Sequence, residues 1–109
     1  IQVSSNFERA LFDALGRDGR AVAALMADLR AGGFRIPQGA LQALRAGFAS
    51  GRASEAQTSA TIARLRATTG ELLCPHSAVG VHVAEQHLGP VPMVTLATAH
   101  PAKFPDAVE

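Results

Sequence analysis

The residues best suited to chemistry lie near the end of the sequence, where polar side chains follow an apolar run. The run around Val94 and Leu96 is rich in apolar and β-branched residues, which is typical of a strand buried on both faces. The strand must end before Pro101, because proline cannot donate to a ladder and restricts the residue before it. Thr98 and His100 therefore follow the carboxyl end of a predicted strand, where open α/β sheets bind ligands. We interpret both as candidate ligand-binding groups.

A second group of chemically capable residues surrounds Pro75. Cys74 and His76 flank this proline, and His82 and His87 follow. Structural zinc usually needs four ligands in compact pairs, and this spacing does not match, so we predict no metal. Cys74 is a weak candidate nucleophile, because a histidine two residues away in sequence does not supply the geometry of a dyad. The simpler interpretation is a small buried cysteine with histidines at a helix start or on a helix surface.

Composition and charge argue against several classes of protein. The 109 residues include 10 basic and 9 acidic side chains, for a net charge of +1, and the basic residues are scattered. Clustered basic residues with stacking aromatics would be expected of a nucleic-acid surface, so no nucleic-acid partner is predicted. No apolar run approaches membrane-spanning length, and one cysteine favours a reducing compartment, here the cytoplasm. The first residue is not methionine, which suggests a piece of something longer.

Local start and stop signals predict helices through most of the chain. Asp18 can cap one helix, and Ser54 with Gln57 three residues later forms a capping-box pattern at another. The first helix begins at a Ser-Ser-Asn sequence and the third begins near a proline. The fourth has a thin apolar face, mostly Ile62 and Leu65, which suggests an exposed helix or one packed against something absent. The four predicted helices occupy residues 4–16, 18–33, 37–51 and 54–68.

The segment after residue 75 is ambiguous on pattern alone. Val79, Val81 and Val83 alternate as in a strand, but the same region also permits a helical face. A short terminal helix could open at Pro105.

Three stretches carry a resemblance to one family. TAHPAKF at residues 98–104, SSNFER at residues 4–9 and PHSAVG at residues 75–80 resemble signatures of threonine synthase, in the family's order and at plausible spacing. Together they span nearly the whole chain, and three matches are more specific than one. The chain therefore resembles a C-terminal fragment of this pyridoxal-phosphate enzyme of the tryptophan synthase β-like fold type. The resemblance also implies that the ambiguous segment is a helix opening at Pro75.

The resemblance implies an α/β fold for the parent enzyme. Within it, this chain should be mainly α-helical, with about five helices and two or three short strands that belong to a larger sheet. Residues 1–70 should form a helical subdomain. Residues 71–109 should form a strand–helix–strand part of the pyridoxal-phosphate domain.

The same resemblance assigns the cofactor contact to Thr98. In this fold type a Ser or Thr hydroxyl meets the pyridine nitrogen, and a hydroxyl, unlike a carboxylate, leaves that nitrogen largely neutral. Alternatively, the Thr98 side chain caps the strand end or bonds local backbone.

Four further residues are candidates for substrate binding by resemblance: Asn6, Arg9, His100 and Lys103. Helix capping explains Asn6 equally well. Lys103 is the only lysine of the chain. We do not assign it as the Schiff-base lysine, because in threonine synthases that residue lies in the N-terminal half. The sequence also lacks a Gly-rich loop that could hold the cofactor phosphate.

The implied function is a lyase reaction in which O-phosphohomoserine and water give threonine and phosphate. The chain alone should be inactive, and its partners should be the substrate and the remainder of the parent chain. The alternative is a free-standing helical interaction module without catalysis, which would have a self-sealed core. A fragment would instead expose apolar surface along its final predicted strand and its fourth helix.

Overall fold

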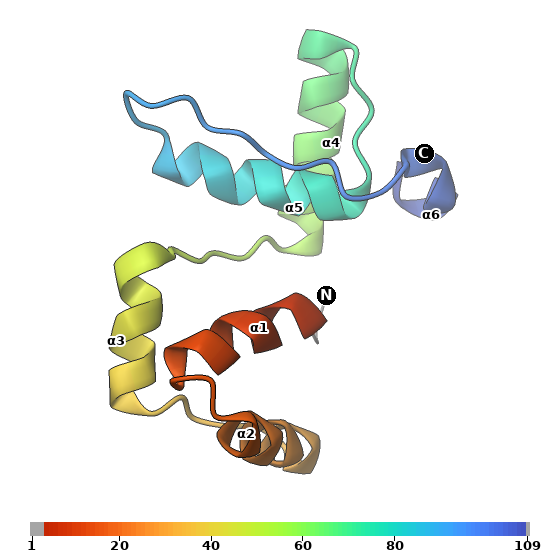
Figure 1. Ribbon diagram of the computed structural model, residues 1–109. Coiled ribbons are helices and arrows are strands. Elements are labelled where there is room, and N and C mark those ends of the chain that lie inside the picture. Colours follow the sequence, from red (N-terminus) through yellow and green to blue (C-terminus); the bar gives the residue numbers. More distant parts are fainter. Residues whose placement is uncertain (1–3, 109) are drawn as a thin grey trace. The chain divides into compact units, whose positions relative to one another are not determined.

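A computed structural model describes residues 4–108, and the chain divides into two compact units, Ile1–Ala49 and Ser50–Glu109 (Figure 1). Each unit is described by itself. The first contains α1 (Ser5–Ala14), α2 (Gly19–Ala31) and α3 (Gln38–Gly47). The second contains α4 (Glu55–Thr69), α5 (Pro75–Ala84), the 3-10 helices η1 (Glu85–His87) and η2 (Pro101–Lys103), and the short helix α6 (Pro105–Val108).

In the first unit α1 packs against both α2 and α3. Leu11 of α1 is fully buried, and Ala40 and Leu44 of α3 are buried as well. The predicted cap of α2 is confirmed, because the Asp18 carboxylate accepts hydrogen bonds from the backbone N–H groups of Arg20 and Ala21 at 2.9 and 3.2 Å. These bonds satisfy two of the donors that a first helical turn leaves free.

The predicted capping box at the start of α4 is also confirmed. The Ser54 hydroxyl accepts from the Gln57 N–H at 3.2 Å, and the Gln57 side chain accepts from the Ser54 N–H at 2.8 Å. At the other end, Gly70 takes a left-handed conformation with φ of 79° and closes the helix.

α4 packs against α5, and two of its three buried residues are threonines. Thr58, Thr61 and Ile62 are buried. The two hydroxyls donate to the carbonyls of Ser54 and Gln57, four residues earlier, at 2.9 and 2.8 Å. The two buried hydroxyls are therefore satisfied by backbone carbonyls. Ile62 of the predicted thin apolar face is buried and Leu65 is half-buried, while most other residues of α4 are exposed.

After α5 the chain turns and runs back along that helix toward α6 (Figure 1). The returning segment packs closely against α5, since a Cβ added at Gly80 would lie 3.1 Å from the Thr95 Cγ2 atom. An ion pair links η1 to α4, with the Arg64 guanidinium 2.7 Å from both oxygens of the Glu85 carboxylate.

The predicted strands are absent from residues 4–108, so this part of the chain is helical with irregular links. Residues 91–98 have an extended, irregular course, and Val91, Val94 and Leu96 are 75%, 78% and 75% exposed. A strand exists only where a second extended segment pairs with its N–H and C=O groups. Here the neighbour is α5, whose backbone groups are already bonded within the helix. The short run at Leu72 and Leu73 likewise lies in a link.

Candidate functional site

The candidate site is the N-terminal end of α5 together with residues 98–104, which return to it. Cys74 is the N-cap of α5, and its sulfur accepts the Ser77 N–H at 3.4 Å. The Cys74 Sγ and Ser77 Oγ atoms are 3.1 Å apart. Both side chains are buried, with 1% and 4% exposure. Pro75 occupies the first turn, where its missing N–H costs no hydrogen bond.

Ser77 connects this helix end to Thr98. The Thr98 backbone N–H donates to the Ser77 hydroxyl oxygen over a long 3.3 Å. The Thr98 residue itself is exposed, and its hydroxyl makes no hydrogen bond within residues 4–108. The backbone of Thr98 is therefore anchored, while its side chain is open to a ligand.

A ring contact secures the far end of the segment. The His76 and Phe104 rings lie 5.0 Å apart between centroids at an interplanar angle of 59°. The His76 Nδ1 atom is buried and has no hydrogen-bond partner within residues 4–108. Residues 98–104 are thus attached to the first turn of α5 at both ends.

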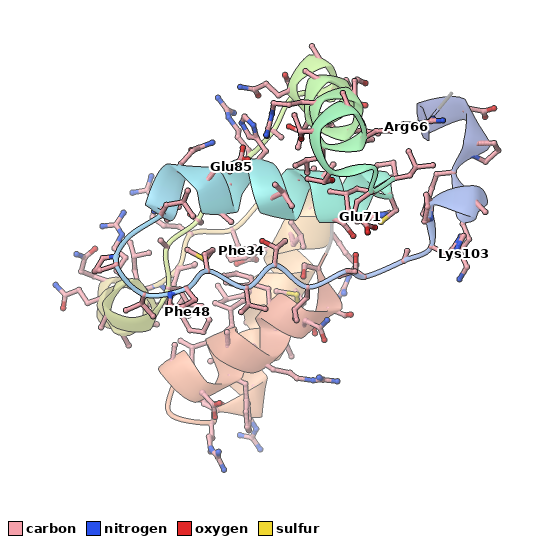
Figure 2. All side chains as sticks on the ribbon, turned by 90° about the horizontal axis from the view of Figure 1, so that it is seen from above. Phe34, Phe48, Arg66, Glu71, Glu85 and Lys103 are labelled. Atoms are coloured by element: carbon pink, nitrogen blue, oxygen red, sulfur yellow. The ribbon has the colours of Figure 1, made fainter. Side chains whose placement is uncertain are left out.

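His100 and Lys103 lie between these two anchors, on or beside η2. The His100 Nδ1 atom accepts the Ala102 N–H at 3.2 Å and caps η2. An accepting Nδ1 carries no proton, so in the neutral ring the Nε2–H remains as a donor for an external group. Lys103 is exposed (Figure 2). The structure therefore brings three predicted residues, Thr98, His100 and Lys103, onto one short segment.

Asn6 and Arg9 belong to α1 in the first unit, and both are exposed. The predicted alternative role for this stretch was helix capping. Ser4 is indeed the N-cap residue, but its side chain makes no capping hydrogen bond. Arg9 borders a shallow groove of about 550 Å³ whose wall includes Phe12 and Val22. Capping therefore accounts for little of this stretch.

The Cys74 thiol has an unusual electrostatic environment. Burial opposes ionisation and raises its pKa, but hydrogen bonds from the Ser77 side chain and backbone and from the backbone of Ala99 and His76 outweigh this effect. The net result is a pKa below the ordinary value of a thiol. Within α5 the sulfur accepts the Ser77 N–H, and it lies 3.1 Å from the Ser77 hydroxyl oxygen to which Thr98 donates.

Ser77 is part of the candidate site, and the sequence analysis assigned it no role. The local signal was a Cys-Pro-His-Ser sequence, which can form a helix cap. The bond to Thr98 spans 21 positions and has no local signal.

No group of three or more His, Cys, Asp or Glu side chains is placed to hold a metal among the described residues. Within the same part of the chain, no helix combines the length and apolar character needed to cross a membrane.

Comparison with known proteins points to one family. The family model described as "Threonine synthase, C-terminal" matches residues 77–109. The threonine synthase of Pseudomonas aeruginosa is 49% identical, with 100% of this chain aligned to 24% of that protein. The threonine synthase of Corynebacterium glutamicum is 44% identical, with 99% of this chain aligned to 24% of that protein.

A solved structure agrees with the sequence comparison. The crystal structure of PLP-bound threonine synthase from Brucella melitensis is 55% identical, with a TM-score of 0.82 over 99% of this chain and 24% of that one. The chain spans about a quarter of the length of the curated relatives it matches. Over its whole length, then, this chain is similar to threonine synthases, and its residues 77–109 match the C-terminal model of that family.

Proposed function

We propose that this chain is the C-terminal part of a threonine synthase, which converts O-phosphohomoserine and water to threonine and phosphate with pyridoxal phosphate. The single observation that carries the proposal is the match to threonine synthases over at least 99% of the chain. The candidate site supports the proposal, because the Thr98 hydroxyl is exposed to a ligand while the Thr98 backbone N–H is held by Ser77.

The residues present suit one contact to pyridoxal phosphate. When bound, the cofactor supplies an electron sink for chemistry at the substrate. The Thr98 hydroxyl is a neutral donor without a partner in residues 4–108, and it can donate to an unprotonated ring nitrogen.

The substrate that we propose is an anion. His100 can donate through Nε2–H, and Lys103 carries a positive charge on the same segment. Phosphate and carboxylate groups are recognised by such donors. We assign these two residues to the substrate, with Asn6 and Arg9 as the corresponding candidates from α1.

The alternative of a free-standing interaction module has less support. It predicted a self-sealed core, whereas large apolar side chains are exposed along residues 88–96. The remainder of the enzyme chain is the partner that we propose for this part of the molecule. We further propose a cytoplasmic location, which agrees with the single free cysteine.

The test uses the full-length protein that contains this chain. Phosphate release from O-phosphohomoserine should require pyridoxal phosphate and should yield threonine. Thr98→Ser retains the hydroxyl and should keep much of the turnover. Thr98→Val keeps the shape but removes the donor, and should weaken the transition-state interaction by about 1–3 kcal/mol. If Thr98→Val equals wild type in turnover and in cofactor absorbance, the assignment of Thr98 is wrong; if no phosphate is released, the proposed reaction is wrong.

A further inference from the structure

We propose that Ser77 is a positioning residue for Thr98, and that Cys74 fixes the direction of the Ser77 hydroxyl. This inference rests on the proposed function, because it deepens the role assigned to Thr98. It concerns three side chains that meet at the first turn of α5.

The hydrogen-bond inventory determines how the three groups are arranged. The Ser77 oxygen accepts the Thr98 N–H at 3.3 Å, so the hydroxyl proton is free to point elsewhere. The Cys74 sulfur lies 3.1 Å from that oxygen. A hydroxyl has one proton to donate and can accept at the same time, so the Ser77 oxygen can accept the Thr98 N–H while its O–H donates to the Cys74 sulfur, which is the arrangement that we propose. In this arrangement each group donates to the next, from the exposed Thr98 backbone through the Ser77 hydroxyl to the buried Cys74 sulfur.

The Ser77 hydroxyl is not needed to cap α5. The capping bond at this end is made by the Ser77 backbone N–H to the Cys74 sulfur. The hydroxyl instead reaches a residue 21 positions away. Burial of both side chains, at 1% and 4% exposure, limits their rotation and gives the exposed Thr98 a fixed support.

A second contact restricts the movement of residues 98–104 about the hydrogen bond between Thr98 and Ser77. The tilted contact of the His76 and Phe104 rings holds the segment six residues beyond Thr98. Adjacent residues of α5, His76 and Ser77, therefore hold the two ends of residues 98–104. Loss of the Ser77 hydroxyl would leave Thr98 attached through only one of these two points.

The experiment uses Ser77→Ala in the full-length protein, with Thr61→Val as the matched control. Both substitutions remove a buried hydroxyl with 4% exposure, but the Thr61 hydroxyl bonds only within α4. In Ser77→Ala, amide exchange at Thr98 should accelerate about fivefold, as expected from loss of one ordinary hydrogen bond. Turnover should fall while KM stays within about twofold, because orientation and not substrate affinity is affected. Thr61→Val should change neither the exchange at Thr98 nor the kinetic constants.

The positioning role is separated from the cofactor role by a double substitution. If Ser77 acts through Thr98, Ser77→Ala should not shift the absorbance of bound pyridoxal phosphate further once Thr98→Val is present. Additive shifts in the double variant would overturn the proposal. Unchanged amide exchange at Thr98 in Ser77→Ala would also overturn the proposal, whether or not the cofactor absorbance shifts. If instead Thr98→Val leaves the absorbance unchanged, the cofactor assignment fails, and the exchange measurement still decides whether Ser77 holds Thr98.

A second variant covers the case in which Ser77→Ala does not fold. Cys74→Ala removes the sulfur and frees the Ser77 hydroxyl to rotate. Amide exchange at Thr98 should then be faster than in the wild type, and unchanged exchange would overturn the assigned role of Cys74.

Discussion

At the scale of single residues, the Cys74 thiol links the cap of α5 to the returning segment. A buried thiol normally resists ionisation, but donors from Ser77, Ala99 and His76 surround this sulfur. Because its pKa is lowered in the folded protein, folding favours the thiolate over the thiol.

This environment predicts how stability depends on pH. The contribution of the ionised thiol should be fully present above the ordinary thiol pKa and should be lost as pH falls through the lowered folded pKa. The unfolding free energy of wild type relative to Cys74→Ala should therefore increase with pH across that window. Ultraviolet thiolate absorbance, measured as the difference between these proteins, should report the same pKa. A difference that is flat with pH would contradict the assignment, and Ser77→Ala should move the titration upward.

A second prediction concerns Lys103. It is exposed and lies on η2. When the full-length holoenzyme is reduced with borohydride, peptide mapping should place the cofactor label upstream of this chain. The isolated chain, treated in the same way, should show no stoichiometric label. Specific, stoichiometric labelling of Lys103 would overturn the assignment of this chain to the C-terminal part.

At the scale of elements, the close return of the chain along α5 predicts different responses from two helical glycines. A Cβ at Gly39 in α3 meets no atom within 4 Å, so Gly39→Ala should stabilise by about 0.4–1 kcal/mol. A Cβ at Gly80 in α5 would lie 3.1 Å from the Thr95 methyl carbon, so Gly80→Ala should stabilise less or should destabilise. Urea denaturation measures both.

The control removes the methyl group itself. Thr95→Ser in the Gly80→Ala background should recover the difference between the two glycine variants. If Gly80→Ala is as stabilising as Gly39→Ala on its own, residues 91–98 do not pack on α5 as described.

Elements with local signals could be predicted from the sequence, and those that depend on distant partners could not. Asp18 and Ser54 marked helix starts because a cap needs only its own first turn. The apolar run around Val94 has strand composition, but composition does not supply a pairing partner. The site was predicted in part for the same reason: Thr98 lay in a family signature, whereas its support, Ser77, became visible only when α5 and the returning segment met.

At the scale of the whole molecule, residues 88–96 form an exposed apolar run. Its large side chains are 44–78% exposed; they are Leu88, Val91, Met93, Val94 and Leu96. The isolated chain should therefore self-associate or bind hydrophobic dyes, and sedimentation should depend on its concentration. Val94→Ser should weaken association without reducing the unfolding free energy, since Val94 is exposed. A monodisperse monomer that binds no dye would favour the interaction module.

The buried threonines of α4 have a consequence for synthesis on the ribosome. α4 precedes α5 in the chain, so it leaves the exit tunnel before the helix that will cover it. If valine or isoleucine stood at these positions, α4 would be prone to aggregation during that interval, because it would expose apolar surface. Thr58 and Thr61 carry hydroxyls that water can solvate before α5 is made, and in the folded chain these hydroxyls donate to backbone carbonyls four residues earlier. We expect Thr58→Val and Thr61→Val together to preserve the folded state while lowering the soluble yield of newly made protein.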